Sequence, residues 1–265
     1  MKAVILCGGR GTRLHEETDV KPKPLVMIGE RPILWHIMKL YSHYGYNDFI
    51  LCIGYKGEMI KNYFLNYDEM ANDFTIKLGS AEKNLVHHNS TRPDWKITFV
   101  DTGGPDVGTG TRIARIKSHI GDDKEFMLTY GDGVSNINLS ELYKYHKEKG
   151  KLATVTGIQR TDHYGIIDID DNGVAVRFAE KPKVRDITNG GFFVCKKDIF
   201  KYLPDEDGTS YMFEDSPLVN ITKDAELAVY HHKGFWQCVD TYKQLLDLNS
   251  MHSTGNRPWM VWESA

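Results

Sequence analysis

The segment "ILCGGRGTRLHEETDVKPKPLV" brings glycines and positive charges together directly after a short apolar run. The glycines are Gly8, Gly9 and Gly11, and the basic residues are Arg10, Arg13, Lys21 and Lys23. Glycines let backbone N–H groups approach a phosphate closely, while arginine and lysine side chains add charge-assisted donors. The combination predicts an anion site, and a phosphate group fits it best.

The spacing of this loop excludes two common phosphate motifs. Leu14 stands where a dinucleotide-binding fingerprint needs its third glycine, and the chain contains no G-x-x-x-x-G-K-[ST] sequence. Neither a Rossmann dehydrogenase nor a P-loop enzyme is therefore indicated. A tight turn beside a solvated basic surface is the other interpretation of the same residues.

Two aspartates follow apolar segments that are far apart in the chain. Asp132 ends "FMLTYGD", and Asp240 lies in "FWQCVDT". Magnesium prefers oxygen ligands and commonly takes one or two carboxylates together with substrate phosphates. If both segments are strands, the two carboxylates could meet over the same phosphates. Taken singly, each aspartate also fits a turn residue or a helix cap.

An α/β fold is expected to position these residues, because strand-like and helix-like segments alternate through the first half of the chain. Expected strands cover 2–7, 48–54, 95–102 and 125–132, and expected helices cover 32–45, 56–67, 110–121 and 139–150. Gly45 is predicted to end the first helix, and Ser140 to cap the last one. In an open parallel sheet, ligands bind beyond the carboxyl ends of the strands, where the glycine loop and Asp132 would lie.

The second half is expected to add β structure. Segments 151–159, 164–182, 189–200 and 226–240 alternate strictly between apolar and polar residues, and Asp171-Asn172-Gly173 is a hairpin signal. The predicted fold is α/β and Rossmann-like: a mixed, mostly parallel sheet with helices on both faces, plus a β-rich part. We expect one domain, 1–265, with halves 1–135 and 136–265. Two long polar stretches, 79–94 and 203–215, are expected to be lids, interface elements or small hairpins.

Composition limits the class of protein. The 265 residues are 41% hydrophobic and 26% charged with a net charge of −3, and no basic stripe suggests a nucleic-acid partner. No apolar run approaches the length of a membrane span. The four cysteines have no C-x-x-C spacing, which favours buried thiols in a cytoplasmic protein.

The motif "CGGRGTRL" followed by Lys23 resembles the signature of sugar-1-phosphate nucleotidyltransferases. The wider sequence is similar to the cytidylyltransferase branch of that family in "EETDVKPKPLV", "YGDGV", "NGGFFV" and "GFWQCVDT". Many members for other bases have a proline where this chain has Glu16, and that departure also matches the cytidylyltransferase branch. The resemblance runs from Met1 to the terminal "RPWMVWE".

The resemblance implies transfer of a cytidylyl group from CTP to glucose 1-phosphate, giving CDP-glucose and pyrophosphate, with Mg²⁺ on Asp132 and Asp240. Arg13, Lys23 and Asp132 would be catalytic. Nucleotide contacts would come from Leu6, Gly8, Gly9, Gly11, Thr12, Arg13, Lys23, Thr109, Arg112 and Gly131. Sugar-phosphate contacts would come from Gly165, Glu180, Lys181 and Asn189. A trimer-based homo-oligomer, with a hexamer as one form, and a role in polysaccharide biosynthesis are also implied.

Several of these residues have simpler interpretations from the sequence alone. Thr109 or Thr111 would serve equally well as a helix N-cap, and "EKP" at Glu180 is an ordinary surface turn. Three other functions stay open: the same chemistry with another nucleotide or sugar phosphate, a catalytically silent subunit that senses a nucleotide sugar, and a structural assembly protein.

Overall fold

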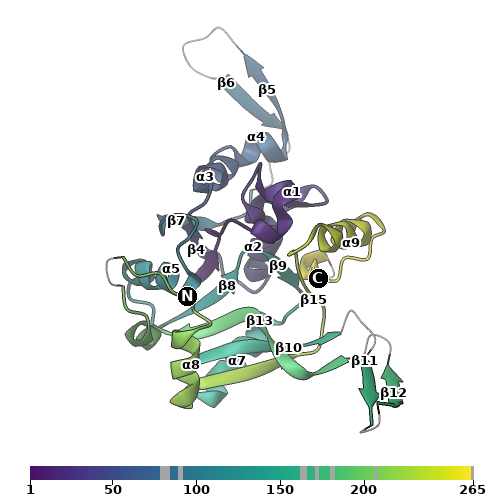
Figure 1. Cartoon of the computed structure of the whole chain (residues 1–265). Coiled ribbons are helices and arrows are strands. Elements are labelled where there is room, and N and C mark those ends of the chain that lie inside the picture. Colours follow the sequence, from purple (N-terminus) through teal and green to yellow (C-terminus); the bar gives the residue numbers. More distant parts are fainter. Residues whose placement is uncertain are drawn as a thin grey trace.

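A seven-stranded sheet with the strand order β14-β10-β13-β8-β1-β4-β7 forms the centre of the protein (Figure 1). The structure is a computed structural model and describes residues 1–77, 84–88, 92–161, 166–170, 173–179, 183–205 and 208–263. The strands are β1 (Ala3–Leu6), β4 (Asp48–Ile53), β7 (Lys96–Asp101), β8 (Glu125–Tyr130), β10 (Ala153–Thr161), β13 (Lys183–Lys196) and β14 (Leu227–His232).

The direction of the strands changes between the two halves of the chain. Strands β8, β1, β4 and β7 are parallel to one another, and β10 is parallel to β14. Strand β13 lies between these groups and is antiparallel to both of its neighbours, β8 and β10. The predicted fold, an α/β protein with a mixed, mostly parallel sheet, is confirmed.

Helices cover both faces of the sheet. The α-helices are α1 (His15–Thr18), α2 (Ile33–His43), α3 (Gly57–Leu65), α4 (Tyr67–Ala71), α5 (Thr109–Arg115), α6 (Lys117–Ile120), α7 (Leu139–Lys149), α8 (Ser216–Lys223) and α9 (Tyr242–Ser253). Short 3₁₀ helices are η1 (Thr12–Leu14), η2 (Lys23–Leu25), η3 (Lys197–Tyr202) and η4 (Val261–Glu263). None of the helices in the described part of the chain combines the length and hydropathy that a transmembrane helix needs.

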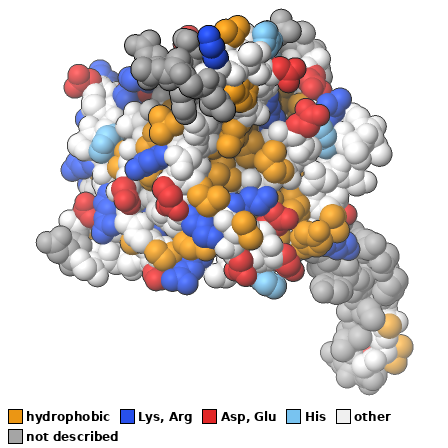
Figure 2. Space-filling model, turned by 90° about the horizontal axis from the view of Figure 1, so that it is seen from above, with side chains coloured by type: hydrophobic (Ala, Val, Ile, Leu, Met, Phe, Trp, Pro, Cys, Tyr) orange, Lys and Arg blue, Asp and Glu red, His pale blue; other side chains and the backbone are white. Residues whose placement is uncertain are grey.

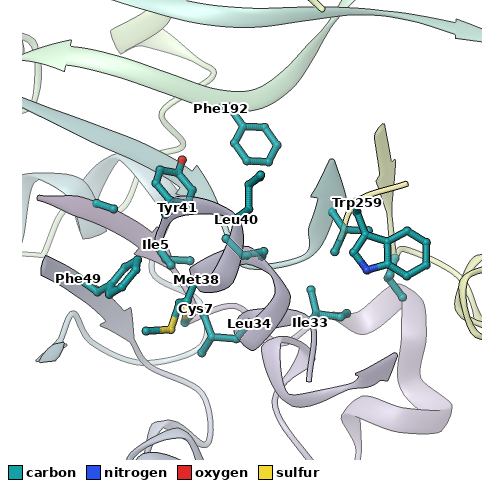
Figure 3. Close-up of a cluster of buried hydrophobic side chains, with 14 of the residues drawn as sticks. Ile5, Cys7, Ile33, Leu34, Met38, Leu40, Tyr41, Phe49, Phe192 and Trp259 are labelled. Atoms are coloured by element: carbon teal, nitrogen blue, oxygen red, sulfur yellow. The ribbon is translucent and has the colours of Figure 1, made fainter. Parts of the chain in front are cut away.

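Successive residues of β1 supply two separate hydrophobic cores, because side chains alternate across a strand. Ala3 and Ile5 belong to one core with α2, whereas Val4 and Leu6 belong to the other with Ile113 of α5. Figure 3 shows side chains of β1, α2 and β4 turned toward one another in the first core. Both faces of the sheet are therefore covered.

The ends of two helices test the predicted caps. Gly45 follows α2 with a φ of 84°, as expected for a glycine that ends a helix. The prediction of Ser140 as the cap of α7 is wrong. The side chain of Asn138 caps this helix by accepting a hydrogen bond from the backbone N–H of Glu141 at 3.0 Å. Helix α7 begins at Leu139, so Ser140 is already inside its first turn.

Small two-stranded sheets extend from the central one. Strands β5 (Asp73–Lys77) and β6 (Asn84–His88) pair as an antiparallel hairpin that projects from one end of the molecule (Figure 1). Strands β11 (Ile166–Ile169) and β12 (Ala175–Ala179) pair in antiparallel fashion, and Asp171 and Asn172 of the predicted turn between them lie outside the described residues. The other pairs are β2 (Met27–Ile28) with β3 (Arg31–Pro32), and β9 (Gly133–Ser135) with β15 (Trp236–Cys238). The polar stretch 79–94 thus contains one strand of a hairpin.

Charged side chains of both signs are mixed on the surface. On the face seen in Figure 2, lysine and arginine side chains alternate with aspartate and glutamate side chains around a central apolar area. Among the described residues on this face, the basic side chains form no continuous stripe of the kind that nucleic-acid binding requires. Three cysteine side chains are buried, those of Cys7, Cys52 and Cys195, whereas Cys238 is half-buried.

Candidate active site

The glycine loop follows β1 at the carboxyl end of the central parallel strands, as predicted. Gly11 has a φ of 66°, a left-handed conformation that favours glycine, and it leads into η1. A Cβ atom on Gly8 would lie only 2.2 Å from the Arg112 guanidinium, so a larger residue here would have to displace that side chain. Gly9 has open space around it and faces the cleft described below.

The pairing of β9 with β15 brings the two aspartates together. Asp132 directly precedes β9, and Asp240 follows β15 after one intervening residue, Val239. The strands are antiparallel with Gly133 opposite Cys238, and the backbone N–H of Val239 donates to the Asp132 carbonyl at 2.9 Å. Residues that are far apart in the sequence therefore lie side by side.

Lys23 lies between the two carboxylates. Its Nζ donates to Asp132 Oδ2 at 2.8 Å and to Asp240 Oδ1 at 2.7 Å. Burial alone would lower the pKa of Lys23, but the charges and hydrogen bonds of both aspartates outweigh burial and raise it. Lys23 is therefore a fixed positive charge at the mouth of the glycine loop.

Arg13 adds a second cation beside the same carboxylate. Its Nη1 donates to Asp240 Oδ2 at 2.9 Å, while 77% of its side chain is exposed. Burial raises the pKa of Asp240. The hydrogen bond from Lys23 and the charges of Lys23 and Arg13 lower this pKa by more, so the net shift is downward. Two cations thus keep Asp240 ionised, Arg13 from η1 and Lys23 from η2.

These groups line one cleft of about 390 Å³. Its walls include all the predicted nucleotide-side residues: Leu6, Gly8, Gly9, Gly11, Thr12, Arg13, Lys23, Thr109, Arg112 and Gly131. Asp132 and Asp240 also line it, and the residues described contain no cluster of three or more metal-ligating side chains. Asp132 and Asp240 converge on the Lys23 ammonium, and two carboxylates this close to each other suit a magnesium ion that takes its other ligands from phosphates and water.

Arg112 lies in the wall of the cleft, but it points its donors at the backbone. Its guanidinium is buried and donates to the carbonyls of Gly8 at 3.0 Å, Gly103 at 3.1 Å and Gly104 at 2.6 Å, and to Thr102 Oγ1 at 2.9 Å. Arg112 therefore joins the glycine loop to the loop after β7. A contact between Arg112 and a nucleotide stays a prediction.

Thr109 is the first residue of α5, and Gly108 is the N-cap residue. The Thr109 hydroxyl donates to Glu214 Oε2 at 2.8 Å and accepts from the backbone N–H of Phe213 at 2.8 Å. Its hydroxyl is thus already engaged by the segment before α8. A contact between Thr109 and a base stays a prediction.

The predicted sugar-phosphate residues are only partly covered. Gly165, Glu180 and Lys181 lie outside the described residues. Asn189 is exposed in β13, and its Nδ2 donates to the Tyr130 hydroxyl at 3.5 Å. Tyr130 itself lines the cleft immediately before Gly131. Asn189 thus reaches the cleft through one side chain, that of Tyr130.

Comparison with known sequences identifies the family. A sequence model described as nucleotidyl transferase matches residues 2–254. The chain belongs to the nucleotidyl transferase family. The match covers nearly the whole sequence and confirms the family that the N-terminal motif predicts.

Two of the similar nucleotidyl transferases match this one over almost its whole length, and a more distant one matches it in part. A probable glucose-1-phosphate cytidylyltransferase of Bacillus subtilis (strain 168) is 52% identical over 262 residues, which cover 99% of this chain and 100% of that protein. The glucose-1-phosphate cytidylyltransferase of Salmonella typhi is 44% identical over 265 residues, with the same shares covered. A UTP–glucose-1-phosphate uridylyltransferase of Synechocystis is 27% identical over 216 residues, which cover 77% of this chain and 51% of that protein.

Solved structures show the same fold. HddC from Yersinia pseudotuberculosis has a TM-score of 0.67 at 22% identity and covers 95% of this chain and 99% of its own. A putative glucose-1-phosphate thymidylyltransferase from Bacillus anthracis has a TM-score of 0.66 at 17% identity, covering 95% and 94%. The nucleotidyl transferase fold is therefore shared far beyond the closely similar sequences.

Sequence reasoning missed two polar side chains of this nucleotidyl transferase site, Tyr130 and Glu214. The Tyr130 hydroxyl donates to Glu214 Oε1, and Glu214 also accepts from Thr109. Glu214 comes from the polar stretch 203–215, where no residue pattern marked it. Tyr130 reads as a strand residue in "FMLTYGD" and gave no signal of its own.

Proposed function

We propose that this nucleotidyl transferase moves a cytidylyl group from CTP to α-D-glucose 1-phosphate, giving CDP-glucose and pyrophosphate. The observation that supports the reaction type is the position of Lys23, which bridges Asp132 and Asp240 at 2.8 Å and 2.7 Å beside the glycine loop. The names of relatives at 44–52% identity support the choice of cytidine nucleotide and glucose 1-phosphate.

The reaction needs no protein nucleophile. A phosphate oxygen of the sugar phosphate attacks the α-phosphorus of CTP and forms the new P–O bond. The bond from that phosphorus to the bridging oxygen of pyrophosphate breaks, and pyrophosphate leaves with the electron pair. The attacking phosphate is already ionised, so no side chain has to remove a proton. The protein supplies alignment and positive charge, which are the main demands of such transfers.

Lys23 and Arg13 have different tasks in this proposal. Lys23 is buried and has two fixed partners, so its ammonium would hold the α-phosphate and the sugar phosphate close to each other. Arg13 is exposed and would hold the side of the departing pyrophosphate with its planar fork of donors.

Asp132 and Asp240 would hold Mg²⁺, which when bound supplies further positive charge to the phosphates. Both carboxylates would also keep the Lys23 ammonium in place beside the phosphates, since the three side chains share one cluster of contacts.

The test is pyrophosphate release by purified protein with Mg²⁺ and glucose 1-phosphate, run in parallel with CTP, dTTP, UTP, ATP and GTP, and repeated with EDTA. We expect fast release with CTP alone and its loss in EDTA. Pyrophosphate release with another nucleotide would assign the enzyme to that nucleotide instead of CTP. Nucleotide binding without turnover, under any condition, would favour a regulatory subunit instead.

We also propose a homo-oligomer built from trimers and a cytoplasmic location. The projecting hairpin of β5 and β6 carries exposed apolar side chains, those of Phe74, Ile76 and Val86, which support a protein contact there. All four cysteines are unpaired, as is usual for cytoplasmic proteins.

A further inference from the structure

Residues 210–214, here called the strap, lie across the start of α5. The backbone N–H of Gly108 donates to Ser210 Oγ at 2.9 Å, and the N–H of Gly110 donates to the Tyr211 carbonyl at 3.1 Å. The N–H of Tyr211 in turn donates to Thr111 Oγ1 at 3.1 Å. The strap therefore accepts hydrogen bonds from backbone N–H groups at the N-terminus of α5. Thr109, the first residue of this helix, lines the cleft.

Two glycines allow the strap to lie this close. A Cβ atom on Gly108 would lie 2.1 Å from the Tyr211 carbonyl oxygen, and one on Gly110 would lie 2.4 Å from the Tyr211 ring. Any larger residue would lift the strap from the helix. The glycines of "GTGTR" thus serve the contact with the strap.

The strap ends in Glu214, whose two carboxylate oxygens have different partners. Oε2 accepts from the Thr109 hydroxyl at 2.8 Å, and Oε1 accepts from the Tyr130 hydroxyl. Thr109 belongs to α5 and Tyr130 to the end of β8, and both line the cleft. One half-buried carboxylate thus joins two walls of the cleft.

Tyr130 continues the connection to the sugar side. Its hydroxyl accepts from Asn189 Nδ2 at 3.5 Å, and its ring packs against Gly191, where a Cβ atom would lie 2.4 Å from the ring. The chain of contacts therefore runs from Thr109 through Glu214 and Tyr130 to Asn189.

We propose that Glu214 is a positioning residue that holds the nucleotide wall and the sugar wall of the cleft in one fixed geometry. The inference rests on the proposed function, because it assigns both walls to substrates. Glu214 acts through Thr109 and Tyr130. Loss of its carboxylate would leave two hydroxyls without their shared acceptor and let the two walls move independently.

The experiment compares Glu214→Ala and Glu214→Gln with Asp215→Ala, a control at the next position, whose side chain is exposed and makes no capping hydrogen bond. Steady-state kinetics give kcat and the KM for CTP and for glucose 1-phosphate. Hydrogen exchange is followed in peptides that cover 108–112 and 126–132. We expect Glu214→Ala to raise both KM values about tenfold, since hydrogen bonds to charged groups are among the strong ones.

Glu214→Gln keeps the shape and one carbonyl acceptor, so it should restore much of both KM values. In Glu214→Ala, both peptides should exchange faster than in the wild-type protein and in Asp215→Ala. If Glu214→Ala only lowers the melting temperature, or raises one KM and leaves the other unchanged, the inference is overturned. If the wild-type protein is inactive with every nucleotide, the proposed function fails, and the exchange rates, which need no substrate, still decide the role of Glu214.

Discussion

At the scale of single residues, three side chains depend on one another. Asp132 and Asp240 would repel each other if Lys23 did not lie between them, and Lys23 would be an unpaired buried cation without them. The raised pKa of Lys23 expresses the same dependence, because the ammonium is favoured by both carboxylates. Changing any one of the three should therefore alter the behaviour of the other two.

We expect Lys23→Ala to lower kcat at least about a hundredfold, as the loss of one charge-stabilising donor does in other active sites. The fold should persist, because Lys23 belongs to neither hydrophobic core. Turnover by pyrophosphate release and far-UV circular dichroism measure the two effects. Lys21→Ala is the matched control, since Lys21 forms an i,i+4 ion pair with the half-buried Glu17 and the change should alter kcat by less than about twofold. Near-normal turnover in Lys23→Ala would remove Lys23 from the mechanism.

Residue types revealed the glycine loop, the two cations and the two aspartates, because each is the group that phosphate or magnesium chemistry needs. They could not reveal Glu214, since its partners Thr109 and Tyr130 lie far away in the sequence and are brought close only by the strap. Arg112 was also predicted from its type, as a nucleotide contact. In the structure its buried N–H groups donate to the backbone carbonyls of Gly8 and Gly104.

At the scale of elements, Glu125 fixes the start of β8, the strand that ends beside Asp132. It accepts from Lys147 Nζ at 2.8 Å and from the Tyr143 hydroxyl at 2.9 Å, both on α7. Burial raises the pKa of Glu125, but these hydrogen bonds and the Lys147 charge outweigh burial, and the pKa falls below its ordinary value of 4.5. As pH falls below 4.5, the unfolded chain takes up this proton before the folded protein does.

The stabilisation from Glu125 is therefore present above pH 4.5 and lost as pH falls through the lower, folded-state pKa. We expect Glu125→Gln to lower the free energy of unfolding at about pH 7 and to have a much smaller effect at about pH 3. Urea unfolding at both pH values measures the difference. Glu148→Gln, a change at an exposed position of α7, should have little effect on the free energy of unfolding at either pH. An equal loss at both pH values for Glu125→Gln would contradict the assignment.

The contact between the strap and α5 gives a second prediction for an element. Gly108→Ala should destabilise the protein by about 1–3 kcal/mol, as overpacking does, and raise the KM for the nucleotide. The cause is the carbonyl of Tyr211, which lies 2.1 Å from the position of the new Cβ atom. Thermal unfolding and steady-state kinetics measure both effects. Gly104→Ala is the control, because a Cβ atom there meets nothing within 4 Å. Equal behaviour of the two variants would show that the strap is free to move.

Element types followed from the sequence more readily than element ends. Hydrophobic periodicity predicted α2, α3 and α7 because each has one apolar side against the sheet. The identity of the residue that caps α7 depends on where the first turn begins. The helix begins at Leu139, which makes Asn138 the cap; a start two residues later would have made Ser140 the cap. The pairing of β9 with β15 carried no local signal, since its partners come from opposite halves of the chain.

At the scale of the whole molecule, the hairpin of β5 and β6 is the feature that a monomer explains least. It projects from the body of the protein (Figure 1), and Val86 on it is 58% exposed. Apolar side chains on a projecting two-stranded sheet are typical of a surface that another chain covers.

We therefore expect the protein to elute as a multiple of its 30.3 kDa protomer mass in size-exclusion chromatography with light scattering. The double variant Phe74→Ser/Val86→Ser should shift the distribution toward smaller species, because it removes apolar area from the contact. Val219→Ser, an exposed apolar position on α8, is the control for a general loss of hydrophobicity. A wild-type protein that runs as a monomer at all concentrations would refute the proposed assembly.

The pairing of β9 with β15 also sets the moment at which the protein becomes active during its synthesis. Asp132 leaves the ribosome long before Asp240, and β9, the strand directly after Asp132, has no partner until β15 has emerged. The parallel strands β1, β4, β7 and β8 can assemble earlier because all of them precede residue 133. A nascent chain can therefore hold a folded glycine loop and still lack its second carboxylate, so catalysis begins only after β15 and Asp240 have been synthesised.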